Sequence, residues 1–196
     1  MSTKYLTLIV VGLFILIFAG CACNGYNGMV QLDENVKGKW GNVQSEYQRR
    51  TDLIPNLVNT VKGAANFEQK TLTDVIQARA NATQVKIDAN DLSPEKIAQF
   101  QAAQGQVSSS LSRLLAVVEN YPDLKATQNF RDLQAQLEGT ENRIKVARND
   151  FNEAVQGYNS TIRRFPNALF AGMFHFQVKG YFQSEAGADK APDVKF

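Results

Sequence analysis

Bulky apolar side chains recur every seven residues in the second half of the chain. They are Phe130, Leu137, Ile144, Phe151, Tyr158 and Phe165, with Leu133, Thr140, Ala147, Ala154 and Thr161 interleaved at spacings of three and four. This 3-4 alternation keeps one stripe facing a partner along a straight or slightly supercoiled helix. The pattern predicts a helix on the order of 60 Å long, at about 1.5 Å per residue.

Two more apolar stripes with helical spacing precede this one. The nearer stripe comprises Ile97, Phe100, Val107, Leu111, Leu114, Val118 and Tyr121, and it follows Ser93-Pro94-Glu95. Ser suits a helix cap and Pro suits the first helical position. The earlier stripe comprises Val36, Trp40, Val43 and Tyr47, and it continues in phase as Ile54, Leu57, Val61 and Ala64. Each stripe predicts a helix that buries one face against its neighbours.

Pro55 interrupts the earliest stripe and leaves two alternatives. Either Asp52 caps a new helix with Pro55 in its first turn, or one helix runs through and kinks at Pro55. Because Asp52 lies three residues before the Pro, we favour a new helix. The sequence then predicts an all-α fold without strand-like alternation. We expect an up-down four-helix bundle with coiled-coil-like packing, its helices spanning about 28–51, 53–86, 94–120 and 124–164.

An apolar segment precedes the predicted bundle. Residues 6–18 read LTLIVVGLFILIF, which is the length of a signal-peptide core, and the apolar run reaches the lower limit of a membrane span when it is extended to Cys23. The run Phe18-Ala19-Gly20-Cys21 resembles a bacterial lipobox. We therefore favour lipid attachment at Cys21, with an uncleaved transmembrane helix as the alternative. The expected organisation is an anchor over 1–23, a bundle over 28–164 and an aromatic-rich tail over 165–196.

The charges around the apolar segment predict its orientation. Lys4 precedes the segment, and the first charges after it are Asp33 and Glu34. Since cytoplasmic flanks carry the excess of cations, we expect a bacterial membrane location with the bundle outside the cytoplasm.

The composition argues against most catalytic and nucleic-acid-binding classes. The chain of 196 residues has one His, two Cys and a formal net charge of +2. It lacks an HExxH motif, a CxxC pair, a GxSxG elbow and a glycine-rich phosphate loop. A near-neutral chain has no electrostatic reason to bind nucleic acid. We expect no enzymatic activity, no cofactor, no metal and no nucleic-acid partner.

Several short runs follow one another in a specific order along the chain. They are residues 26–30 (YNGMV), Trp40, residues 48–58 (QRRTDLIPNLV), 61–63 (VKG), 78–80 (ARA), 121–126 (YPDLKA), 137–144 (LEGTENRI), 147–148 (AR), 158–159 (YN) and 165–166 (FP). This order resembles the LemA family over nearly the whole chain after the anchor.

The resemblance implies a membrane-attached bacterial protein with a four-helix bundle and no established enzymatic activity. Relatives are often encoded near other membrane proteins, and one branch is associated with magnetosome membranes. The chain departs from the family pattern at Cys21, because many relatives keep an uncleaved transmembrane segment. It also departs at residues 65–68 (ANFE), where the family more often has an aromatic residue and a His.

Two groups of residues are candidates for binding a partner. Arg49, Arg50 and Asp52 lie beside Pro55, where Arg could clamp an acidic group of a partner. An intramolecular ion pair that fixes the helix junction is the alternative, which we favour. In the tail, Phe170, Phe174 and Phe176 could form an interfacial foot beside the anchor or a docking patch. We favour instead a tail that folds back and closes the open end of the bundle.

We therefore expect a membrane-anchored, non-catalytic helical scaffold or adaptor. Its partners would be the membrane and another envelope or membrane protein, or a second copy of itself in a homo-oligomer. The alternative is a carrier that holds a lipid or another apolar ligand in the bundle. Bulky residues such as Phe151 and Tyr158 indicate a filled core and favour the scaffold.

Overall fold

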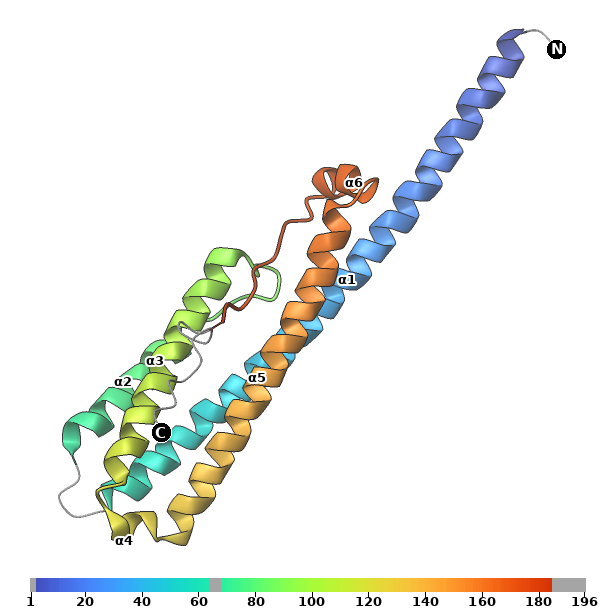
Figure 1. Ribbon diagram of the computed structural model, residues 1–196. Coiled ribbons are helices and arrows are strands. Elements are labelled where there is room, and N and C mark those ends of the chain that lie inside the picture. Colours follow the sequence, from blue (N-terminus) through green and yellow to red (C-terminus); the bar gives the residue numbers. More distant parts are fainter. Residues whose placement is uncertain (1–2, 64–67, 185–196) are drawn as a thin grey trace, which may run out of the picture.

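The computed structural model describes residues 3–63 and 68–184 (Figure 1), apart from the side chains of residues 3–8, 17 and 21. In these residues all regular structure is helical and no strand occurs. The predicted all-α class is confirmed. The elements are α1 (Thr3–Lys62), α2 (Gln69–Gln84), α3 (Pro94–Val118), α4 (Pro122–Lys125), α5 (Gln128–Arg163) and α6 (Asn167–Met173).

The long helices are arranged in two pairs (Figure 1). α1 packs mainly against α5, which runs in the opposite direction, and α2 packs mainly against α3. The short helix α6 follows α5 and contacts both α1 and α5. Beyond α6, the N-terminal part of α1 extends away from the rest of the molecule. Coiled-coil-like packing of these helices in a four-helix bundle stays a prediction.

The apolar stripe of α1 contributes to two cores. Nearer to α6, the Trp40 ring packs between Phe100 of α3 and Phe151 of α5, with ring centroids 5.1 Å and 5.6 Å away. The other core lies toward α4 and contains Leu57 of α1, with side chains from α2 to α5 around it. Burial of the apolar face of α1 is therefore continuous from Met29 to Val61, as the stripe predicts.

The predicted start of a new helix at Pro55 is wrong. α1 runs without interruption through Pro55 to Lys62, and the next helix begins at Gln69. Asp52 does not act as a cap, because its carboxylate accepts a hydrogen bond of 2.7 Å from Gln48 within the same helix.

A side chain of α2 compensates for the hydrogen bond that Pro55 removes from the interior of α1. Pro55 has no N–H, so it leaves the carbonyl of Thr51, four residues earlier, without its helical donor. Arg79 of α2 donates its Nε–H to that carbonyl oxygen at 3.0 Å. The half-buried Arg79 thus replaces the missing backbone bond and ties α2 to α1 at the same point.

The predicted single helix over 53–86 is also wrong, because α1 ends at Lys62 and α2 spans Gln69–Gln84. The boundaries of the two later helices agree better with the expectations. α3 begins at Pro94, and the apolar stripes of α3 and α5 are buried over most of their length. Phe165 was expected to continue the stripe of α5, but it is 83% exposed. Because α5 ends at Arg163, the seven-residue spacing no longer determines where Phe165 points.

Candidate functional site

Arg50 lies in the interior of the molecule although it carries a charge. Its side chain is 1% exposed, and its Nη1 donates to Ser108 Oγ at 2.8 Å and to Glu141 Oε1 at 2.9 Å. Its Nη2 donates to the main-chain and side-chain oxygens of Gln104 at 3.2 Å and 2.5 Å. One guanidinium from α1 therefore joins α3 and α5.

These contacts correspond to the intramolecular alternative that the sequence favoured for Arg50. A buried charge is tolerated only when it is paired and hydrogen-bonded, and Arg50 has both kinds of partner. Arg49 and Asp52 lie on the exposed side of α1. The structure therefore does not bring Arg49, Arg50 and Asp52 together on one surface, and their partner-binding role stays a prediction.

After α6 the chain runs back between α3 and α5 (Figure 1) as a non-helical segment, residues 177–184, which we call the C-terminal strap. Asn159 of α5 accepts from the Lys179 N–H and donates to the Lys179 carbonyl, both at 2.9 Å. Asn152 makes the same pair of bonds, also at 2.9 Å, with Phe182. Two amide side chains thus bind the strap through its backbone.

A third amide completes this arrangement from the other side. Gln101 of α3 accepts from the Gln183 N–H and donates to the Gln183 carbonyl, both at 2.9 Å. The carbonyl also accepts from Arg148 at 2.8 Å. The strap therefore bridges α3 and α5, and its Phe182 ring packs on Trp40 at a centroid distance of 6.2 Å.

Sequence reasoning missed this site, although a signal for it exists. Asn152 and Asn159 are seven residues apart, which is about 10.5 Å along a helix at 1.5 Å per residue. Lys179 and Phe182 are three residues apart, which is about 10 Å in an extended chain. Amides repeated in the same register as an apolar stripe can therefore mark a helix face that binds an extended segment.

Charges also hold the strap to α1. Lys179 is 7% exposed, and its Nζ lies 2.8 Å from Asp33 Oδ1 and 5.0 Å from the Tyr158 ring centroid. Burial acts to raise the pKa of Asp33, but hydrogen bonds from Lys179 and Lys37 outweigh it and hold that pKa below its ordinary value. Burial, together with the nearby Asp33 charge, raises the pKa of Tyr158 to about 12. Tyr158 therefore stays protonated and donates to the Gln177 carbonyl at 3.0 Å.

The predicted tail aromatics gather around α1. The Phe170 side chain is 2% exposed, and its ring centroid lies 5.4 Å from that of Phe18. The rings of Phe174 and Phe176 lie 4.9 Å and 5.8 Å from Tyr26. The tail thus folds back onto α1 beside the apolar segment. The side chain of Cys21, the predicted lipid attachment point, lies outside the described residues, and its modification stays a prediction.

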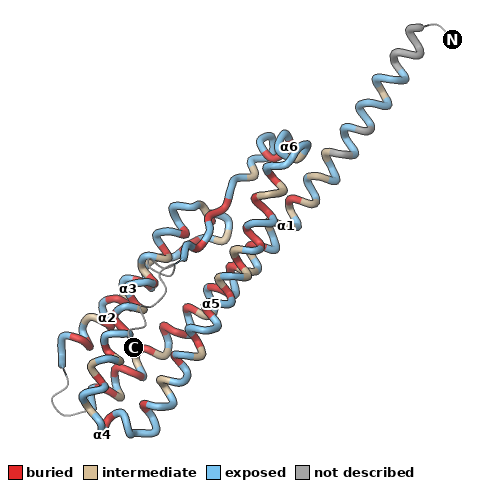
Figure 2. The backbone as a smooth tube through the Cα atoms, viewed as in Figure 1, coloured by how far each residue is buried: buried red, intermediate tan, exposed pale blue. Residues whose placement is uncertain are grey.

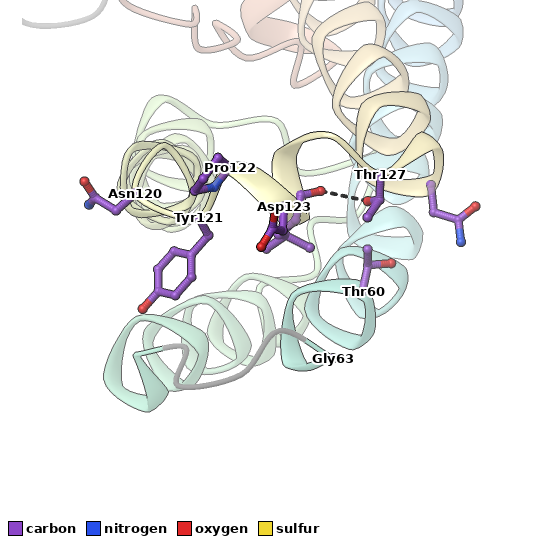
Figure 3. A pocket seen from close by; sticks show the side chains of 9 residues that line it. Thr60, Gly63, Asn120, Tyr121, Pro122, Asp123 and Thr127 are labelled. Carbon is purple, nitrogen blue, oxygen red and sulfur yellow. Dashed lines mark hydrogen bonds between the residues drawn. The ribbon is translucent and has the colours of Figure 1, made fainter.

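A second candidate site is an open pocket of about 730 Å³ at the opposite end of the molecule (Figure 3). It lies where α1 ends and around α4, with Thr60 and Asp123 among its lining side chains. Thr127 orders this corner, because its hydroxyl donates to the Leu124 carbonyl at 2.8 Å and accepts from Phe130 N at 3.4 Å. The pocket coincides with the run at 121–126 that carries part of the family resemblance, and we call it the distal pocket.

The side chains of the distal pocket are mostly uncharged. The distal pocket offers one carboxylate, from Asp123, among hydroxyl and amide groups. Over residues 3–63 and 68–184, no group of three or more His, Cys, Asp or Glu could hold a metal ion.

The N-terminal part of α1 is exposed and apolar (Figure 2). Phe14 and Leu16 are each 70% exposed, and no described residue of the apolar window of α1 is buried. Among the described helices, α1 is the one whose length and composition would allow it to cross a membrane. An exposed apolar surface of this length favours a lipid environment.

Comparisons with known proteins agree with the resemblance. The model of the LemA family matches residues 39–196. The chain is 26% identical to magnetosome protein MamQ 2 of Paramagnetospirillum magneticum over 84% of its own length and 66% of the relative, so it spans less than two thirds of that protein. It is 22% identical to protein LemA of Metamycoplasma hominis, over 81% of this chain and 67% of the relative. These names are not those of enzymes, and together with α1 the matches support a membrane-associated protein.

Proposed function

We propose, from the premise that the chain belongs to the LemA family, that it is a membrane-anchored, non-catalytic scaffold that holds a protein-binding surface away from the membrane. The observation that carries this proposal is the continuity of α1. One helix includes the exposed apolar residues around Phe14, then Trp40 in one core and Leu57 in the other. An anchor and a bundle that share a helix move as one body, because no loop separates them.

The length of α1 gives this scaffold a defined reach. From Asn24 to Lys62 the helix rises about 60 Å, at about 1.5 Å per residue. α5 accompanies it, which stiffens the rod by side-by-side packing. The distal pocket lies at the far end of this rod from α6 (Figure 1). A partner bound there would be held at a fixed distance from the lipid surface.

Because of membrane anchoring, a weak protein–protein interface would also be enough to bind an anchored partner. Confinement to a surface raises the effective concentration of one anchored protein toward another. The MamQ relatives carry the name of the magnetosome, which supports a role in organising an assembly. The carrier alternative has less support, because the Trp40, Phe100 and Phe151 rings fill the core in which an apolar ligand would bind.

Site-specific photo-crosslinking in intact cells tests the proposal. A photo-crosslinking residue replaces Asp123 at the distal pocket, and a matched chain carries it at Val146, which is 61% exposed on α5. We expect one defined membrane or envelope protein, or a second copy of the chain, to be captured from Asp123 and not from Val146. The same capture from both positions, or from neither, would contradict a distal partner site.

A further inference from the structure

An exposed apolar stripe lies at the α6 end of the molecule. Leu169 and Met173, four residues apart in α6, are 58% and 64% exposed, and Phe165, just before α6, is 83% exposed. We call these three residues the foot. Phe170 and Ala171 of the same segment are buried against the core, so α6 is amphipathic, with its second apolar face directed outward. Large apolar side chains grouped on a surface indicate a contact with another apolar phase.

The position of α6 relative to α1 identifies that phase. Phe170 packs on Phe18, the last bulky residue of the apolar run, at a centroid distance of 5.4 Å. Gly25 of α1 permits this approach, because a Cβ there would lie 2.9 Å from Asn167 Oδ1. α6, which carries Leu169 and Met173 of the foot, therefore lies beside α1 where the apolar run ends (Figure 1).

The residues around the foot are those typical of a membrane interface. Arg163 and Arg164 precede it directly and are exposed. Tyr26 of α1, whose ring lies 4.9 Å from that of Phe174, is 40% exposed. Tyr rings concentrate at the headgroup level of bilayers, and exposed Arg residues attract anionic lipids.

We propose that the foot inserts into the lipid–water interface of the membrane that anchors α1. The inference rests on the proposed membrane anchoring and adds a second attachment point beside it. It applies to the uncleaved form of the anchor, because processing at Cys21 would remove Phe18, on which Phe170 packs. Two separate attachments restrict the tilt of the α1–α5 rod, which a single helix or lipid anchor leaves free.

Fluorescence of the full chain in vesicles tests this inference. The variant Leu169→Trp is reconstituted in phosphatidylcholine vesicles with a fraction of phosphatidylglycerol, and brominated acyl chains serve as the quencher. The parent chain supplies the background from Trp40, which is 0% exposed. We expect a blue-shifted emission from the introduced indole and at least twofold quenching. The matched control, Val146→Trp on α5, is expected to show a water-like emission without quenching.

Flotation of the same vesicles separates the two proposals. A chain that does not float with vesicles contradicts the proposed membrane anchoring. If the chain floats but Leu169→Trp shows water-like, unquenched emission, the membrane anchoring stands and the insertion of the foot into lipid is contradicted.

Two further outcomes concern what the foot contacts. Protection of the introduced indole in native membranes but not in vesicles would assign the foot to a protein partner and would also overturn the lipid contact. A loss of quenching in the variant Arg163→Gln/Arg164→Gln would support the anionic-lipid contribution, and quenching independent of phosphatidylglycerol would contradict it.

Discussion

Arg79 Nε lies 3.0 Å from the carbonyl oxygen of Thr51, the acceptor that Pro55 leaves without a backbone donor. The two residues lie on different helices, so one hydrogen bond repairs α1 and orients α2 at once. This relationship explains why α1 is continuous despite an internal proline. The contribution of Arg79 to stability should therefore depend on Pro55, which a pair of substitutions can test.

Removing the guanidinium of Arg79 should lower the free energy of unfolding mainly when Pro55 is present. We expect Arg79→Met, which keeps the aliphatic stem, to lower the free energy of unfolding by about 1–2 kcal/mol, because a buried carbonyl loses its donor. In the Pro55→Ala background residue 55 supplies its own N–H, and the same substitution should cost about 0.5 kcal/mol or less. Urea unfolding in detergent of the parent chain, the two single variants and the double variant gives the coupling free energy between Arg79 and Pro55. Equal costs in both backgrounds would show that Arg79 does not act through Thr51.

Neighbouring arginines should differ sharply in their effect on stability. Arg50→Met leaves polar groups of Gln104 and Ser108 without their donor in the interior and is expected to cost about 2–4 kcal/mol. Arg49→Met, on the exposed face of the same helix, should change the free energy of unfolding by less than about 0.5 kcal/mol. Thermal unfolding of both variants provides the measurement. Similar midpoints for the two would rule out a structural role for Arg50.

The strap depends on amides that both donate and accept. Asn159→Asp keeps the acceptor for the Lys179 N–H but places a carboxylate against the Lys179 carbonyl, so we expect the strap to open more often. Hydrogen exchange at the amides of Lys179 and Phe182 should become at least about tenfold faster, which corresponds to about 1.4 kcal/mol. Asn149→Asp, at an exposed position of α5, is the control. Unchanged exchange in Asn159→Asp would mean that the amide bonds do not hold the strap.

The ion pair between Asp33 and Lys179 should weaken in acid. Since the pKa of Asp33 is lowered in the folded chain, the pair contributes stability above the ordinary carboxyl value of 3.8 and loses it as the pH falls through the lower folded value. Below pH 3.8 we therefore expect a steeper loss of unfolding free energy in the parent chain than in Asp33→Asn. Glu34→Gln, at an exposed neighbour, should retain the parent slope. Identical slopes for parent and Asp33→Asn would contradict the link.

The sequence predicted the helices well where an apolar repeat determines them. Trp40, Leu114 and Phe151 are buried as their stripes require, because each helix can bury only one face. The break expected at Pro55 was wrong because the compensating donor, Arg79, lies on another helix and leaves no local signal. Phe165 was misplaced because a repeat carries no information beyond the end of its helix.

The candidate sites were less accessible to sequence reasoning. Arg50 could be recognised as an ion-pairing residue, but its partners on α3 and α5 follow only from the packing of three helices. Asn152 and Asn159 look like ordinary residues of a solvated face until the strap is seen against them. The strap binds because the distance between the two Asn residues along the helix matches the distance between Lys179 and Phe182 along the strap. No single sequence motif encodes such a match.

The distance between the distal pocket and the bilayer tests the central claim most directly. A donor dye at Asp123 of α4, in full chain reconstituted in vesicles, is paired with acceptor dyes on the lipid headgroups, and a donor at the exposed His175 beside α6 serves as the reference. A rigid rod that continues the anchor predicts weak transfer from Asp123, at a separation on the order of 60 Å, and strong transfer from His175. Equally strong transfer from both positions would show that the bundle lies on the membrane and would contradict the account.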